Sequence, residues 1–168
     1  MKTVLNLFWQ LCLLRQSPEY VPTQGWFIAT IVAGNLLATV LLSFALGVEQ
    51  PILSTVTSAV VTQATIAGLV WLALFLREHP ERLLATITAA FGCDLIISAC
   101  FGAIIPLIAV LPEIFLSITY LTFLVWSVAV TGFILHRALK VNMAIGITVS
   151  LGITVLSVAA SQVAIGAA

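Results

Sequence analysis

Long apolar stretches separated by short polar turns dominate this chain. Five of them reach the length of about 20 residues that an α-helix needs to cross a hydrocarbon core of about 30 Å. They are too long and too uniformly apolar for the alternating strands of a membrane barrel. The pattern therefore predicts an all-α, polytopic membrane bundle with five transmembrane helices, at residues 26–47, 52–76, 83–108, 114–135 and 141–165.

Proline and acidic residues mark the breaks between the predicted spans. Pro51, Pro80 and Pro112 each stand where a helix would begin, a position at which the missing N–H of proline costs nothing. Glu81 and Glu113 directly follow two of these prolines, where an acid favours the positive end of the helix dipole. We interpret both glutamates as first-turn charges without a functional role.

The first 25 residues have a different pattern. Hydrophobic side chains crowd one side of a helix drawn over residues 4–14, while Lys2, Asn6 and Gln10 follow the other side at helical spacing. A charged start before an apolar stretch is also typical of a signal peptide, but no small-residue cleavage site follows it. We predict that residues 1–25 form an amphipathic helix lying in the membrane interface, with a connector, ahead of a transmembrane domain at residues 26–168.

Composition and charge refine this prediction. Of the 168 residues, 62% are hydrophobic and 7% charged, and the net charge of +0 disfavours a nucleic-acid partner. Basic residues lie only before the first span, between the second and third, and between the fourth and fifth: Lys2, Arg15, Arg77, Arg82, Arg137 and Lys140. Because basic residues gather on the cytoplasmic side, we predict a cytoplasmic N-terminus and a C-terminus across the membrane.

Residue patterns of the common enzyme classes are absent from the sequence: it has no zinc-peptidase HExxH, no GxSxG and no phosphate-binding loop. Cys12, Cys93 and Cys100 have no metal-ligand spacing, and we interpret them as apolar packing residues. His79 and His136 stand beside arginines in two turns on the same side, where contact with lipid headgroups is favoured over a shared metal ion. We expect no catalytic residue, no metal and no cofactor.

Asp94 is the exception, since it lies deep within a predicted span. An ionised acid at the bilayer centre costs about 2.5–3.5 kcal/mol, so Asp94 should face protein or a cavity. Asn35 and Gln63 reach a similar depth in the first two spans, and Ser98 lies one turn from Asp94. We predict an intramembrane polar cluster of these four residues, in which a protonated Asp94 ties helices together. The alternative is a proton or cation site, which lacks a second titratable residue at that depth.

Small residues spaced four apart recur along the spans and allow helices to approach closely. On this basis we predict helix-packing positions at Gly34, Ala38, Gly102, Gly146 and Ser150. The fifth span, rich in glycine and serine, is also a candidate for docking against another chain.

The segment "LLRQSPEYVP", the five spans and the turn "LREHPERLLATITAAFG" resemble the bacterial relatives of the Yip family, the Ypt/Rab-interacting membrane proteins. In eukaryotes that family implies membrane-trafficking adaptors without catalytic residues. For the bacterial relatives, the resemblance implies a five-span fold and leaves function open. Together with the orientation predicted from the basic residues, it leads us to expect the inner (cytoplasmic) membrane, with the C-terminus periplasmic.

Function is the least constrained part of this prediction. Loops of four to six residues leave almost no surface for a substrate domain, so we expect no enzyme. The favoured interpretation is a scaffold, assembly or accessory subunit whose partners are the lipid bilayer and other membrane proteins or a second copy of this chain. The alternative is a small proton-coupled transporter or channel that uses Asp94.

Overall fold

The computed structural model describes residues 2–16, 18, 21–47, 51–108 and 112–166. Within these ranges the regular structure is entirely helical, which confirms the predicted all-α bundle. The helices are α1 (Lys2–Cys12), α2 (Gly25–Ala45), α3 (Ile52–Leu76), α4 (Leu83–Ile108), α5 (Glu113–Leu139) and α6 (Met143–Gly166), with a short 3₁₀ turn at Pro80–Arg82. Helices α2 to α6 are each long and apolar enough to cross a membrane, so the chain is a multi-pass membrane protein in contact with lipid.

The turn between α5 and α6 differs most from the prediction. Helix α5 continues beyond the predicted residue 135 to Leu139, and it ends where Lys140 adopts a left-handed conformation with φ of 51°. Asn142 then caps α6, because its Oδ1 accepts a hydrogen bond from the Ile145 N–H at 2.8 Å. The polar residues around His136 predicted an earlier end for this helix. A helix ends, however, only where its backbone turns and its terminal groups are capped.

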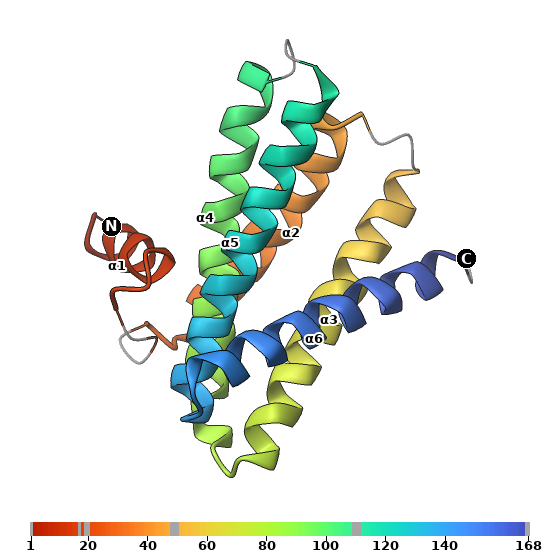
Figure 1. Ribbon diagram of the computed structural model, residues 1–168. Coiled ribbons are helices and arrows are strands. Elements are labelled where there is room, and N and C mark those ends of the chain that lie inside the picture. Colours follow the sequence, from red (N-terminus) through yellow and green to blue (C-terminus); the bar gives the residue numbers. More distant parts are fainter. Residues whose placement is uncertain (1, 17, 19–20, 48–50, 109–111, 167–168) are drawn as a thin grey trace.

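Figure 1 shows α2, α4 and α5 running roughly parallel to one another, while α3 diverges from them and α6 crosses α3. The most extensive helix contacts are α5 with α6, α3 with α6, and α2 with α4, whereas α3 meets α2 and α4 much less. The α3–α4 and α5–α6 turns lie at the same end, where an Arg82 Nη1 donates to the Arg137 carbonyl at 3.4 Å. We name this the basic end, after Arg77, Arg82, Arg137 and Lys140.

Near the basic end, α3, α5 and α6 enclose an apolar cluster, which we name the basic-end core. It consists of Val70, Leu74, Leu135, Ala138, Leu139 and Ile153. Here α5 and α6 approach so closely that a Cβ added to Gly146 would lie 2.4 Å from the Gly132 carbonyl oxygen. One turn further along α6, the Ser150 hydroxyl donates to the Val128 carbonyl at 3.2 Å. Gly146 and Ser150 therefore face α5.

The other predicted packing positions lie along α2 and α4. A Cβ added to Gly34 would lie 3.3 Å from Leu95, and one added to Gly102 would lie 3.2 Å from Leu42, so both glycines accommodate a leucine of the neighbouring helix. Ala38 is half-buried on α2. The absence of a side chain thus brings these two helices together at two levels.

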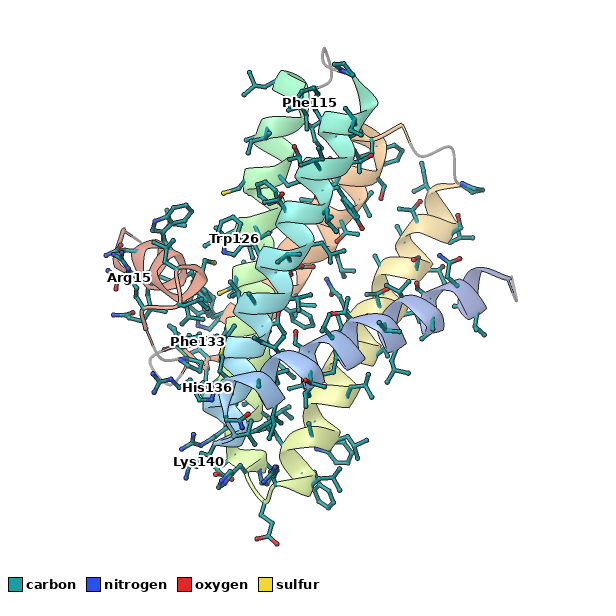
Figure 2. The ribbon with its side chains drawn as sticks, in the orientation of Figure 1. Arg15, Phe115, Trp126, Phe133, His136 and Lys140 are labelled. Atoms are coloured by element: carbon teal, nitrogen blue, oxygen red, sulfur yellow. The ribbon has the colours of Figure 1, made fainter. Side chains whose placement is uncertain are left out.

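Helix α1 does not run along the bundle; Figure 1 shows it almost end-on beside α4. Its Phe8 ring occupies the space left by Gly92, where an added Cβ would lie 2.3 Å from the Phe8 ring. The Cys12 thiol lies 3.8 Å from the Cys93 carbonyl, and the Trp126 indole donates to the Cys12 carbonyl at 3.0 Å (Figure 2). The apolar face of α1 is therefore buried against protein, while its depth in the membrane stays a prediction.

Candidate functional site

Asp94 is the centre of a hydrogen-bonded network that joins four helices. Asn35 of α2 donates from Nδ2 to Asp94 Oδ2 at 2.9 Å, and Gln63 of α3 donates from Nε2 to Asn35 Oδ1 at 2.7 Å. The Ser127 hydroxyl of α5 donates to Asp94 Oδ1 at 3.4 Å. No lysine, arginine or histidine among the described residues forms an ion pair with Asp94.

A backbone carbonyl sets the direction of this network. Asn35 Nδ2 also donates to the Phe91 carbonyl at 3.2 Å, which only an N–H can do, so the Asn35 oxygen must face Gln63. Gln63 in turn must present its Nε2 to that oxygen, and its own Oε1 is left without a partner. Gln63 is only 9% exposed, so its Oε1 is a buried acceptor without a hydrogen-bond partner. The chain of hydrogen bonds runs from Gln63 through Asn35 to the Asp94 carboxyl group.

A cavity of about 180 Å³ lies between α2 and α3 and reaches this network. It is lined by Asn35, Thr39, Ser43, Thr55, Ser58, Ala59, Thr62, Gln63, Ile66, Phe91 and Asp94. From Asn35 to Ser43 the lining extends about 12 Å along α2, away from the basic end, and it covers the same length of α3 from Gln63 to Thr55. The polar lining therefore runs from the Asp94 level almost to the far end of both helices.

The hydroxyl groups of this cavity act chiefly as acceptors. Thr39 donates to the Asn35 carbonyl and Ser43 to the Thr39 carbonyl, both at 3.0 Å, and Thr55 donates to the Pro51 carbonyl at 3.4 Å. Because the protons of these three hydroxyls are used within their own helices, their oxygen lone pairs are what remain for the cavity. The walls thus suit a ligand that donates hydrogen bonds or carries positive charge.

Access to Asp94 differs between the two sides. Beyond Gln63, toward the basic end, α3 contributes the half-buried Ile66 and then Val70 and Leu74 of the basic-end core. These residues pack against apolar side chains of α5 and α6, which carry no hydrogen-bonding groups. The acid is therefore approached by a polar path from one end of the bundle and shielded by apolar packing from the other.

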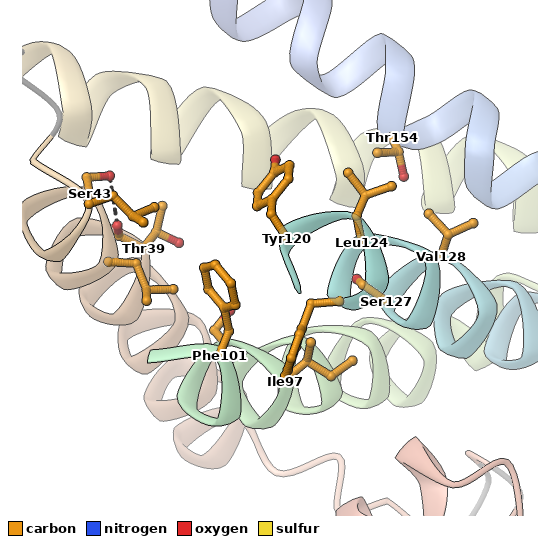
Figure 3. Close-up of a pocket in the computed structure, with 13 residues that line it drawn as sticks. Thr39, Ser43, Ile97, Phe101, Tyr120, Leu124, Ser127, Val128 and Thr154 are labelled. Carbon is orange, nitrogen blue, oxygen red and sulfur yellow. Dashed lines mark hydrogen bonds between the residues drawn. The ribbon is translucent and has the colours of Figure 1, made fainter. Parts of the chain in front are cut away.

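A larger cavity of about 440 Å³ adjoins the first, between α2, α4 and α5 (Figure 3). Thr39 and Ser43 line both cavities, and Ser127 connects the larger one to Asp94 through its hydrogen bond. The remaining walls are Leu42, Leu46, Ile97, Ser98, Phe101, Tyr120, Phe123, Leu124, Val128 and Thr154. Aromatic and aliphatic surface thus begins where the oxygen-lined surface ends.

The structure brings together Asp94, Asn35 and Gln63, three of the four residues expected in the polar cluster. It places Ser98 in the wall of the larger cavity instead. Ser127 takes that place, and sequence reasoning missed it. Its position about halfway along the fourth span matched the depth of Asp94 and was the available signal.

The remaining candidate residues have separate surroundings. His79 lies 3.5 Å from Glu81, and His136 Nδ1 bonds to the Val141 carbonyl, so each histidine has its own neighbour. In the described part of the chain, no group of three or more histidine, cysteine, aspartate or glutamate side chains is arranged to hold a metal. Cys12 is buried in the α1–α4 contact.

The chemistry available at Asp94 is binding and exchange of a proton or cation, since the surrounding groups are carboxyl, amide and hydroxyl.

Comparison of the chain with models of known protein families, with curated proteins and with solved structures finds no match.

Proposed function

We propose that this protein is a small, non-enzymatic membrane transporter or channel that binds a proton or small cation at Asp94. The observation that carries the proposal is the polar cavity whose lining extends from near the far ends of α2 and α3 to a carboxyl group at the middle of α4. An intramembrane acid that faces a polar cavity is typical of ion and proton pathways.

The one-sided access supports a carrier more than an open pore. A continuous pore needs polar surface from end to end, whereas the basic-end core closes the path beyond Gln63. A carrier works from such a state, because it exposes its site to one side at a time. The weak contact between α3 and the α2–α4 pair marks the place where the bundle can change shape.

Proton flux into proteoliposomes tests this proposal. A potassium gradient with valinomycin supplies the membrane potential, and a trapped pH-sensitive dye reports proton entry. Asp94→Asn should assemble normally yet abolish the flux, because an amide cannot exchange a proton at this position. Thr148→Val is the matched control, since it removes an exposed hydroxyl near the start of α6 that lines neither cavity. Equal flux through Asp94→Asn and the unmodified protein would contradict the proposal.

A second candidate, a scaffold or accessory subunit, is favoured by the network itself. Hydrogen bonds from Gln63 through Asn35 to Asp94 and Ser127 tie together four helices, and each interhelical bond in a membrane contributes about 0.6–2 kcal/mol. Such a bundle offers its outer faces to other membrane proteins. This function predicts that Asp94→Asn stays fully active, and that partners co-purify with either form in mild detergent.

We further propose a place in the bacterial inner membrane, with the N-terminus cytoplasmic, and kinship with the bacterial Yip relatives. The gathering of basic residues at one end supports the orientation, and the five spans support the kinship. Ala168→Cys, at a position outside the described residues, should then react with an impermeant maleimide from the periplasmic side only. Labelling from the cytoplasmic side would overturn the orientation.

A further inference from the structure

We propose that the two cavities together bind a lipophilic primary amine, with its ammonium group at Asp94 and its apolar part against Phe101, Tyr120 and Phe123. This inference rests on the proposed function, because it names the substrate class of the same site. It adds a ligand of stated chemistry that suits both the larger cavity and the unpaired Gln63 oxygen.

The polar end of the site matches a primary ammonium group. Such a group has three N–H donors and one positive charge. Asp94 supplies the opposite charge without a competing cation among the described residues, Gln63 Oε1 supplies an unpaired carbonyl, and Thr39 and Ser43 supply hydroxyl oxygens. A quaternary ammonium group has the charge but no N–H, so it leaves the buried Gln63 oxygen unpaired.

The apolar end of the site matches an aromatic or alkyl chain. Phe101 packs against Phe123 with ring centres 5.4 Å apart and against Tyr120 at 6.2 Å, and all three line the larger cavity. Phe101 lies two helical turns from Asp94, about 10 Å along α4. A cavity of about 440 Å³ has the size that small-molecule sites commonly have.

The two lining residues that the cavities share are what favour an amine with a tail. Thr39 and Ser43 belong to both linings, and Figure 3 shows them opposite Phe101 and Tyr120. A ligand that passes these hydroxyls therefore contacts both regions at once. A lipid acyl chain would fill only the aromatic region and would leave the acceptors at Asp94 and Gln63 unused.

Equilibrium binding to the full chain in phosphatidylcholine nanodiscs tests the proposal without any transport step. The probe is radiolabelled phenylbutylamine, displaced by unlabelled phenylbutylamine, by neutral phenylbutanol or by phenylbutyltrimethylammonium. The primary amine should displace the probe about tenfold better than either analogue, because only the amine carries both the charge and the N–H donors. Equal displacement by the alcohol would overturn the proposal and indicate an apolar cavity that any lipid-like chain fills.

Three variants assign the contacts. Asp94→Asn should abolish the preference for the amine over the alcohol, and Gln63→Met should abolish the preference for the primary over the quaternary amine. Tyr120→Leu should weaken all three compounds alike, whereas its control Phe44→Leu, an exposed aromatic that lines neither cavity, should change nothing. Retained selectivity in folded Asp94→Asn would overturn the proposal.

The displacement series on the unmodified protein tests the amine site even where a variant fails to assemble. Amine binding without proton flux would refute the proposed transport and leave the amine site standing. Proton flux without amine binding would refute the amine site alone.

Discussion

Gly146→Ala tests the packing of α6 against α5 most directly. A Cβ at this position would lie 2.4 Å from the Gly132 carbonyl oxygen, 2.8 Å from His136 Cβ and 3.0 Å from the His136 nitrogen. Two of these atoms belong to the backbone of α5, so no side-chain rotation can make room. The two helices must therefore move apart or tilt.

The size of the effect follows from that displacement. Restoring an ordinary contact of about 3.5 Å requires α5 and α6 to separate by about 1 Å, and a gap of that size forfeits about a quarter to a half of each dispersion contact. Overpacking of this kind costs about 1–3 kcal/mol, against a gain of up to about 1 kcal/mol because alanine favours the helix over glycine. We expect Gly146→Ala to lower the free energy of unfolding by about 1–2 kcal/mol.

Equilibrium unfolding in mixed micelles of mild detergent and sodium dodecyl sulfate, followed by tryptophan fluorescence, measures this free energy. Gly152→Ala on the same helix is the matched control, since an added Cβ there meets nothing within 4 Å. The control should be stabilised by up to about 1 kcal/mol through helix propensity alone. If Gly146→Ala proved as stable as Gly152→Ala, the close approach of α5 and α6 would be wrong.

Three further predictions concern α1, a helix end and the network. Gly92→Ala should displace Phe8 and expose the buried Cys12 thiol, so that Cys12 itself reacts with a maleimide that does not reach it in the unmodified protein. Lys140→Gly should raise the free energy of unfolding by about 1 kcal/mol by relieving a left-handed conformation, whereas Lys140→Ala, with the same loss of charge, should not. Asn35→Leu should lower the free energy of unfolding by about 1–3 kcal/mol, measured in the same micelles, because Asp94 and Gln63 on two neighbouring helices each lose a hydrogen bond.

The sequence by itself determined the helices and their order. A backbone in hydrocarbon must satisfy its own hydrogen bonds, so apolar stretches of this length can only be helices, and α3 and α4 have the predicted bounds. Length along a helix also measures depth in the membrane. For that reason, counting residues was enough to put Asn35 and Gln63 at the level of Asp94.

Rotation of each helix about its axis was decided only by the tertiary structure. Lipid and protein interior are both apolar, so the sequence of a span carries little signal for which face turns inward. Counting residues along α4 therefore predicted Ser98 as a neighbour of Asp94, whereas Ser127 of α5 forms that hydrogen bond. Likewise, no pattern in the sequence predicted that the Phe8 ring packs against Gly92. The unpaired oxygen of Gln63 and the cavity beside it likewise exist only because α3 leans away from α2 while its amide still reaches Asn35.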